Sequence, residues 1–588
     1  MLKRAMWVLF GVCLGCDSGG TKAPADDTGP TETGDDTAPP DTTDDTDDST
    51  DSADSADTGL TDTATGADTA APASCGELRH EGTLTWLDID GACPDDGGLL
   101  VVDGNLTLSG DAYQIDLSQL GCVCEVSGDV RVLSNPALLS LEGLDQLERI
   151  GGDLQVQYNP LLERAEGLGA LTSIGGDVLV TENEALAWLT GLSAVASIGG
   201  ELRVEDNPAL LYLYGLEAVV SVGGALTIRD NSVLEQITGL GALTDCASLD
   251  LSALPYLSEL SGLSSLASAP GGVRVEDTRR LQSLPFAGLR EADFVTIRAN
   301  TALAALPSWP ELQTTGELLV EENNRLEAVS LPGLATVDGA VSFQYNRNLS
   351  AIALDGLLEA GELRVENNDR LESLHGPDSL TVLTGELSIS QNDALTSLSG
   401  FEGLERVGSV SVNDNALSSF TGLSALTDVS ELVLIAREPE LETLSVMPSL
   451  TAISELYLQD LERLDVLGGF TALTAIGGDL SIVNCGLGSL DALANVETVG
   501  GTLGLSRNAG LAALPQPMAL REVGALYLYS NSVLADVTGL HDITAVAGDM
   551  SIQSNDVLPP VEVQLLIDAI GEENIGGTVT AENNGSAL

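Results

Sequence analysis

The chain has 588 residues, of which 43% are hydrophobic and 3% aromatic, and it contains 64 glycines. This apolar share excludes a wholly disordered chain, and the many glycines with few bulky rings favour short strands and tight turns. The formal net charge of −66 excludes nucleic acid as a partner, because phosphate binding needs clustered Lys and Arg. The simplest interpretation of the charge is solubility by self-repulsion.

Residues 1–16, MLKRAMWVLFGVCLGC, have the organisation of an export signal. Lys3 and Arg4 precede an apolar stretch that is too short to span a bilayer. The ending Leu-Gly-Cys resembles the lipobox of bacterial lipoproteins, although Cys13 stands where that family usually has an aliphatic residue. The resemblance implies a lipid on Cys16 that anchors the chain in the cell envelope, at the outer membrane or cell surface. The alternative is an ordinary secretory signal with incidental cysteines.

Residues 17–74 are of low complexity and hold 16 acidic residues, with Leu60 as the single large aliphatic residue. Such a segment cannot bury enough apolar surface to offset its ordering entropy, so we expect a disordered, extended tether. It lacks the Gly and Glu spacing of an EF-hand calcium loop. Asp17 resembles an inner-membrane retention signal, which is the alternative to display at the cell surface.

From about residue 99 onward the sequence repeats. GGDLQVQYNPLL from Gly151 and GGELRVEDNPAL from Gly199 share one register: aliphatic, variable, aliphatic, two variable residues, Asn, then an apolar residue. Because alternate residues of a strand point to one side, Leu154 and Val156 face the core together. A single unit leaves its apolar edges open until the next unit covers them. The repeat therefore predicts an all-β solenoid of about twenty coils with 22 to 24 residues each.

An Asn column follows the strands. Its amides can donate to and accept from backbone groups of neighbouring coils, so we predict a structural ladder inside one corner. Counting Asp111 and Asn584 at its ends, the column has 21 positions, of which 15 are Asn. The residues that interrupt it are Leu254, Thr278, Arg437, Leu461 and Cys485. Its other Asn residues are Asn135, Asn159, Asn183, Asn207, Asn231, Asn300, Asn323, Asn346, Asn368, Asn392, Asn415, Asn508, Asn531 and Asn555.

The pattern I-G-G-x-L-x-V-x-x-N-x-x-L resembles the receptor L-domain, the leucine-rich β-solenoid of insulin- and EGF-receptor ectodomains, over roughly residues 99–588. The resemblance implies that the domain binds a partner but does not identify it. Leucine-rich repeats accept Asn or Cys in the column, which fits Cys485. Unlike the receptor domains, this chain continues without a cysteine-rich break, and twenty coils about 4.8 Å apart predict a rod about 95 Å long.

A solenoid needs caps, and the cysteines predict the first of them. Residues 75–128 form the N-terminal cap and first coils. Their four cysteines predict one or two disulfides, with Cys75–Cys93 as the favoured pair and Cys122 and Cys124 as further candidates.

The regular solenoid follows over 129–556. Within it, Cys246 and Cys485 are far apart in the stack, and we expect both to be buried thiols. PPVEVQLLIDAIGEEN breaks the period within 557–588, which predicts a short capping helix before the last strand.

Function is expected on the outward positions of the strands. In one outward column the charges alternate, which predicts stabilising cross-strand pairs: Glu205, Arg229, Ser252, Glu276, Arg298, Glu321, Gln344 and Glu366. Further along, the outward positions become less polar. Our hypothesis is a binding patch, against the alternative of β-formers tolerated on a sheet face. The predicted patch is Val433, Ile435, Tyr457, Val483, Tyr527 and Tyr529.

Catalytic, metal and cofactor sites are not predicted. The three histidines, His80, His375 and His541, fall in different coils, which disfavours a His-based triad or a multi-His zinc site. The leading hypothesis is a lipid-anchored, non-catalytic recognition or adhesion protein for an unknown protein or glycan. A structural envelope spacer is the first alternative. A carbohydrate-active β-helix enzyme with paired carboxylates is the least favoured one.

Overall fold

The computed structural model describes residues 75–76, 78–89, 91–95, 97–110, 117–375 and 377–585. The chain divides into two units, Met1–Thr69 and Ala70–Leu588, and the described residues belong to the second. The expected signal peptide and tether over 1–74, including Cys16, lie outside them. Within the described residues, no helix has the length and apolar character needed to cross a membrane.

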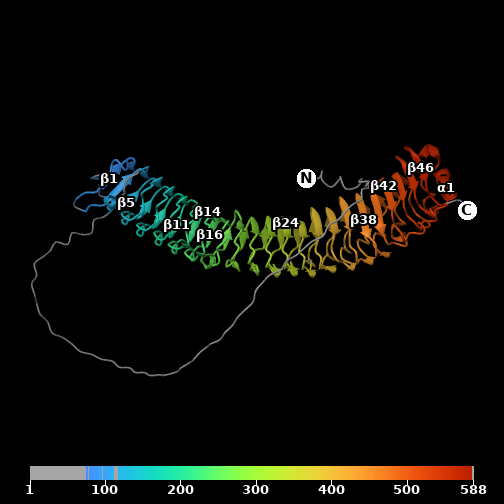
Figure 1. The fold of residues 1–588 in the computed structure, drawn as a ribbon, viewed down its shortest axis with the longest axis horizontal. Helices are drawn as coiled ribbons and strands as arrows, with labels where there is room; N and C mark the ends of the chain where they lie inside the picture. Colours follow the sequence, from blue (N-terminus) through green and yellow to red (C-terminus); the bar gives the residue numbers. More distant parts are fainter. Residues whose placement is uncertain are drawn as a thin grey trace, which may run out of the picture. The chain divides into compact units, whose positions relative to one another are not determined.

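The second unit is an all-β solenoid whose coils stack in chain order from β1 (Leu78–Glu81) to β46 (Val579–Glu582) (Figure 1). The strands pair in parallel, and paired residues lie one coil apart, as Leu154 and Val178 do. One short α-helix, α1 (Pro560–Ile570), precedes the last strand. The predicted solenoid of about twenty coils with a C-terminal helix is therefore confirmed.

Each coil has a long strand, and these strands form the main sheet that runs the length of the stack. Its strands are β2 (Leu84–Thr85), β4 (Leu106–Ser109), β6 (Val130–Leu133), β8 (Leu154–Gln157), β10 (Val178–Thr181), β12 (Leu202–Glu205), β14 (Ser221–Arg229), β16 (Asp245–Ser252), β18 (Val273–Glu276), β20 (Phe294–Arg298), β22 (Glu317–Glu321), β24 (Thr336–Gln344), β26 (Glu359–Glu366), β29 (Glu386–Ser390), β32 (Ser409–Asn413), β35 (Leu432–Ala436), β38 (Glu455–Leu461), β41 (Leu480–Cys485), β42 (Thr498–Ser506), β43 (Glu522–Tyr529), β45 (Met550–Gln553) and β46.

A second side of the coil is made of shorter strands, and the longest strands of the main sheet, such as β14 and β24, run through both sides. The second side contains β1, β3 (Leu100–Asp103), β5 (Val123–Val126), β7 (Arg149–Ile150), β9 (Ser173–Ile174), β11 (Ser197–Ile198), β17 (Ser268–Ala269), β19 (Glu291–Ala292), β21 (Thr314–Thr315), β28 (Val382–Leu383), β31 (Arg406–Val407), β34 (Asp428–Val429), β37 (Ala452–Ile453), β40 (Ala475–Ile476) and β44 (Ala545–Val546).

A third side closes the coil with two- and three-residue strands, which are β13 (Tyr212–Leu213), β15 (Gln236–Ile237), β23 (Ala328–Ser330), β25 (Ala351–Ala353), β27 (Ser373–His375), β30 (Ser397–Ser399), β33 (Ser419–Phe420), β36 (Thr443–Leu444) and β39 (Val466–Leu467). Short 3-10 turns lie at η2 (Leu117–Leu120), η3 (Ser261–Leu263), η4 (Asp491–Leu493), η5 (Thr538–Leu540) and η6 (Glu572–Asn574).

The interior is one continuous apolar core. Leu154 and Val156 of β8 point inward and are buried, whereas Gln155 and Gln157 face outward, as the period of two predicts. The glycine pairs let successive coils approach closely: a Cβ at Gly175 would lie 2.2 Å from the carbonyl oxygen of Gly151. Any larger residue at that position would force the two coils apart.

The Asn column is buried and hydrogen-bonded from coil to coil. The backbone N–H of Asn183 donates to Oδ1 of Asn207 at 3.1 Å, and Asn183 Nδ2 donates to the carbonyl of Val156 at 2.9 Å. The residue before each ladder position, such as Glu182 with φ 55°, is left-handed, and this turn aims the amide into the corner. Each side-chain amide thus satisfies an N–H and a carbonyl group of the preceding coil, as Asn183 does for Asn159 and Val156.

One ladder position differs from the prediction, which placed Arg437 in the column. Arg437 has φ 51° and is the turn residue, so Glu438 takes the buried position. The Oε1 atom of Glu438 accepts from Asn415 Nδ2 at 2.8 Å, and its Oε2 atom accepts from the Leu417 N–H at 3.2 Å. A carboxylate can accept these bonds as an Asn oxygen does, which is why it fits the column.

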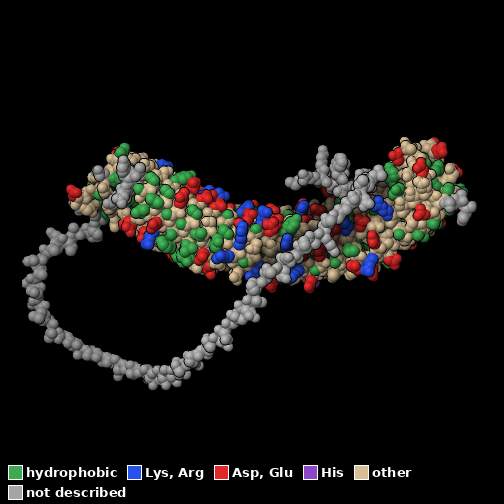
Figure 2. All heavy atoms as spheres, viewed as in Figure 1, with side chains coloured by type: hydrophobic (Ala, Val, Ile, Leu, Met, Phe, Trp, Pro, Cys, Tyr) green, Lys and Arg blue, Asp and Glu red, His purple; other side chains and the backbone are tan. Residues whose placement is uncertain are grey.

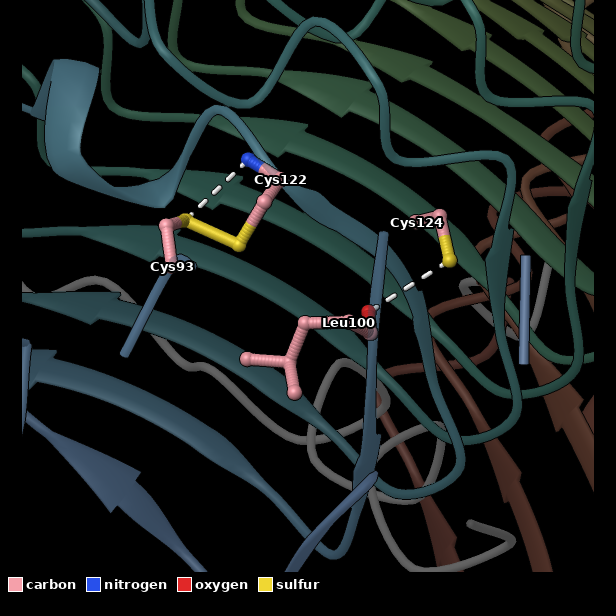
Figure 3. Close-up of a disulfide and its surroundings, with 4 residues drawn as sticks. All are labelled: Cys93, Leu100, Cys122 and Cys124. Atoms are coloured by element: carbon pink, nitrogen blue, oxygen red, sulfur yellow. Dashed lines mark hydrogen bonds between the residues drawn. A yellow bond between two sulfur atoms is a disulfide. The ribbon is translucent and has the colours of Figure 1, made fainter. Parts of the chain in front are cut away.

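The disulfides join Cys75 to Cys124 and Cys93 to Cys122, so the expected Cys75–Cys93 pair is wrong. Residues about one or two coils apart meet in a solenoid, whereas Cys75 and Cys93 are separated by less than one coil. Figure 3 shows the Cys93–Cys122 bond, with the Cys122 N–H donating to Cys93 Sγ at 3.3 Å. Cys124 Sγ lies 3.4 Å from the carbonyl oxygen of Leu100, where strand β5 bulges against β3.

The two remaining described cysteines, Cys246 and Cys485, are free and buried, as expected. Burial raises the pKa of each thiol to about 12, so both are protonated at neutral pH. Cys485 occupies a ladder position, and its backbone N–H donates to Oδ1 of Asn508 at 3.0 Å.

Candidate functional site

The outward face of the main sheet is the candidate site. Two residues of each strand point outward, and the register places them in two continuous columns. Arg203 pairs with Thr227, and Glu205 pairs with Arg229, one coil further on. Because the strands are hydrogen-bonded on both sides, the backbone holds these columns at fixed spacing.

Between β12 and β26 this face carries many charges. Arg229 Nε donates to Glu205 Oε1 at 2.7 Å, and Arg298 lies between Glu276 at 3.3 Å and Glu321 at 3.0 Å. The predicted cross-strand pairing of alternating charges is therefore confirmed. Figure 2 shows Arg side chains lying among acidic ones over the middle of the stack.

Acidic residues outnumber basic ones throughout the solenoid. Residues 17–74 hold 16 of the 89 acidic residues and residues 1–22 hold three of the 23 basic ones, which leaves a net charge of −53 on residues 75–588. Every basic residue of 75–588 is Arg. Arg suits these positions because its planar fork can bridge carboxylates of adjacent strands.

Toward the C-terminus the outward columns lose their charge. In the two columns that run through Tyr457 and Gln459, the outward residues of β35, β38, β41, β42, β43 and β45 are all uncharged, and we call this set the neutral strip; Glu455, at the start of β38, faces outward next to these columns. Its members are Leu434, Ala436, Tyr457, Gln459, Ser481, Val483, Gly504, Ser506, Tyr527, Tyr529, Ser551 and Gln553.

Two of the predicted patch residues do not lie on the neutral strip. Val433 and Ile435 are fully buried, because they pair with the inward residues Val410 and Val412 of β32. The residues of β35 in the two outward columns are Leu434, which is half-buried, and Ala436, which is buried under its neighbours. In the sequence, the inward positions Val410 and Val412 of the preceding coil indicate which residues of β35 point inward.

The other four predicted patch residues lie on the outward columns: Tyr457, Val483, Tyr527 and Tyr529. Tyr527 is 38% exposed and Tyr529 46% exposed, whereas Tyr457 is half-buried and its hydroxyl donates to Asp479 Oδ2 at 3.2 Å. Burial and the acidic neighbour Asp479 raise the pKa of Tyr457, so its phenol stays neutral. Tyr527 and Tyr529 are therefore the accessible aromatic rings of the strip.

Hollows of two kinds lie elsewhere in the described solenoid. A space of about 10 Å³ lies among Trp309, Leu312 and Leu334, which is room for about one water. An open groove of about 620 Å³ runs over the turns at Glu182 and Asp206. Burial and neighbouring carboxylates raise the pKa of Asp206 in this groove. Neither hollow encloses a chamber that could hold a substrate.

Two residues of catalytic type meet on the third side. His375 and Ser399 pair across β27 and β30, with Nδ1 of His375 3.5 Å from Oγ of Ser399. Both are outward members of neighbouring strands, and the distance is at the limit of a hydrogen bond. Among the described residues, no cluster of three or more His, Cys, Asp or Glu side chains is placed to hold a metal ion.

No protein-family pattern and no curated protein sequence matches the chain. Three solved structures are similar to parts of the chain at low scores. A leucine-rich repeat protein from Bacteroides ovatus is 15% identical over 70% of this chain and 88% of its own, with a TM-score of 0.24. A chain of the Drosophila Toll–Spatzle complex is 14% identical over 86% and 84%, with a TM-score of 0.29. A chain of the TLR13–ssRNA13 complex is 14% identical over 83% and 79%, with a TM-score of 0.23.

At these TM-scores the likenesses carry no argument about the architecture or the ligand of this chain.

Proposed function

We propose that the chain is a non-catalytic recognition scaffold of the bacterial cell envelope, which presents the outward face of its main sheet to a protein or glycan. The observation that carries the proposal is the continuity of this face. Its two outward columns run without a register break from β29 to β41, and each strand is held by neighbours on both sides. Such a face is pre-organised, so a partner binds it without ordering flexible loops.

The proposal includes an anchor at Cys16 and a tether over 17–74. It rests on the lipobox resemblance and on the acidic, aliphatic-poor composition of the tether. A chain of 58 residues can reach about 190 Å when stretched, which would carry the solenoid clear of a membrane. The resemblance to receptor L-domains agrees with a recognition role at the envelope.

The anchor is tested on whole cells. Intact mass of the mature protein is expected to include a diacyl or triacyl group on Cys16, and Cys16→Ala is expected to release the chain from the membrane fraction. External protease is expected to cleave the displayed wild type. An unlipidated wild type that leaves the cells freely would remove the anchor from the proposal.

The recognition face is tested by placing a photo-crosslinking amino acid at single positions in cells. Ser481 and Ser551 lie on the outward face of the main sheet, and Ser373 and Ser397 lie on the third side as matched controls. We expect adducts from the first pair only. Adducts from neither pair would instead make the chain an envelope spacer, and equal adducts from both would contradict a dedicated face.

A further inference from the structure

We propose that the neutral strip binds an uncharged polysaccharide chain, which lies along the stack and crosses the strands from β35 to β45. This inference rests on the proposed recognition function and names its partner. Three features of the strip support it: its charge, its width and its aromatic residues.

The charge of the strip differs from that of the same columns between β10 and β20, whereas the adjoining β29 and β32 carry uncharged Ser388, Ser390, Ser411 and Asn413 there. In six earlier strands, β10 to β20, seven of the twelve outward positions are charged, among them Arg203, Glu205 and Asp250. None of the twelve positions of the neutral strip is charged, on a solenoid whose net charge is −53. A partner can therefore cover the strip without desolvating a charge, and a charged partner would find no counter-charge there.

The strip is long and narrow. Six strands about 4.8 Å apart span about 24 Å, and two outward residues of one strand lie about 7 Å apart. Acidic side chains border it, with Asp479 on one side and Asp460 on the other. A standard protein interface covers about 800 Å² per partner and would extend over these acids. The strip therefore suits a thin chain.

An extended peptide is a thin chain too, but it binds sheets chiefly through main-chain hydrogen bonds at a free edge. The strands of the strip have no such edge: β38 pairs with β35 on one side and with β41 on the other, and β43 pairs with β42 and β45. A polysaccharide needs no edge, because its hydroxyl groups bond to side chains.

The side chains of the strip match a sugar chain. Tyr527 lies between Gly504 and Ser551, and Tyr529 lies between Ser506 and Gln553, so small or polar neighbours leave both rings accessible. An aromatic ring presents a negative face, which attracts the C–H groups on the flat side of a pyranose. Serine hydroxyls and glutamine amides supply both donors and acceptors for sugar hydroxyls.

The test is affinity electrophoresis of the detergent-solubilised full chain through gels that contain laminarin, dextran, hydroxyethylcellulose or galactomannan, with polygalacturonate as an anionic control. At least one neutral polysaccharide is expected to retard the wild type, and 0.05 M and 0.5 M NaCl are expected to give the same retardation. Tyr527→Ala with Tyr529→Ala is expected to weaken binding at least tenfold. Tyr345→Ala, which removes an equally exposed ring outside the strip, is expected to leave it unchanged.

A second variant, Ser506→Glu, adds one charge to the strip and is also expected to weaken binding at least tenfold, with an unchanged melting temperature. Retardation by polygalacturonate alone, or equal retardation of the tyrosine variant and wild type, would overturn the proposal. If no neutral polysaccharide retards the chain while Ser481 and Ser551 crosslink to a protein in cells, the polysaccharide assignment falls and the recognition function stands. If there is neither retardation nor an adduct, both fall.

Discussion

Glu438 and Asn415 share one buried hydrogen-bonded junction, in which Oε1 of Glu438 accepts from the backbone N–H of Asn415 at 3.1 Å and from its Nδ2 at 2.8 Å. Both side chains lie in the Asn column, and Glu438 is fully buried. Burial raises the pKa of Glu438 to about 7, although its hydrogen bonds from Asn415 and Leu417 act in the opposite direction. The ladder therefore has a titratable position in the coil of Glu438.

This position predicts how stability depends on pH. The folded pKa lies above the ordinary value of 4.5, so the folded chain holds the proton more tightly than the unfolded chain. The contribution of Glu438 is complete below about pH 4.5, and the free energy of unfolding falls by about 3 kcal/mol as the pH rises to 7 and above. Glu438→Gln keeps one acceptor oxygen for Asn415, replaces the oxygen that faces the Leu417 N–H with an NH2 group, as protonation replaces it with a hydroxyl, and cannot ionise.

We therefore expect Glu438→Gln to raise the melting temperature at pH 8 and to leave it nearly unchanged at pH 5. Thermal unfolding followed by circular dichroism at both pH values makes the comparison. Glu440→Gln is the matched control, because Glu440 is 54% exposed and pairs with Arg463. An equal effect of both substitutions at pH 8 would mean that burial of Glu438 is not the cause.

The ladder predicts that substitutions of two adjacent asparagines, Asn367 and Asn368, differ sharply in their cost to stability. Asn368 is buried, its Oδ1 accepts from the N–H of Asn346 at 3.1 Å, and its Nδ2 donates to the carbonyl of Phe343 at 3.0 Å. Asn368→Gly leaves both backbone groups without partners and is expected to cost about 2 to 5 kcal/mol. Asn367→Gly is expected to cost little, because Asn367 has φ 57° and glycine accepts that conformation. Similar melting temperatures for the two variants would refute the ladder's role.

Most of this fold could be predicted from the sequence, since a 22- to 24-residue period places each strand, turn and Asn one coil above the last. The error at Arg437 arose because a step from Asn415 to either Arg437 or Glu438 fits the 22- to 24-residue period. Asn413 pairs with Ala436, so Arg437 takes the left-handed turn position of Asp414 and Glu438 takes the ladder position of Asn415. The disulfides could not be predicted, because the first coils are irregular and β5 bulges at Cys124.

The cap predicts a local effect of disulfide loss. Removal of the Cys93–Cys122 bond by Cys93→Ala and Cys122→Ala is expected to destabilise the N-terminal cap by roughly 3 kcal/mol. Because each coil contacts only its neighbours, the effect should stay at that end. Hydrogen exchange is expected to rise in β1 to β5 and to stay unchanged in β43. Faster exchange along the entire stack would contradict coil-by-coil stability.

The charged half of the outward face predicts a dependence on salt. Arg298→Glu sets three carboxylates side by side, between Glu276 and Glu321, and is expected to destabilise the solenoid by about 1 to 2 kcal/mol at 20 mM NaCl. High salt screens exposed charges, so most of the loss should return at 0.5 M. Arg298→Gln should change stability by less than about 1 kcal/mol. Thermal melting curves at both salt concentrations make the comparison. A loss of stability that persists at 0.5 M NaCl would mean that packing, not charge, is responsible.

The candidate site was predictable only in part. Tyr457, Val483, Tyr527 and Tyr529 were found because period-two alternation is clear in their strands. Every position of Leu432–Ala436 is apolar, so alternation gives no register there, and pairing with β32 decides it. The pattern within one strand cannot show that the outward positions of six adjacent strands are uncharged, because only the pairing between strands aligns these positions.

We expect a partner to cover the neutral strip in the cell. Hydroxyl-radical footprinting of the protein on intact cells, compared with the purified chain, measures this directly through its native tyrosines. Tyr527 and Tyr529 are 38% and 46% exposed, and Tyr158, Tyr256 and Tyr345 are 49%, 43% and 47% exposed and lie outside the strip. We expect Tyr527 and Tyr529 to be protected on cells while the other three tyrosines react as in the purified protein. Equal oxidation of all five on cells and in solution would contradict it.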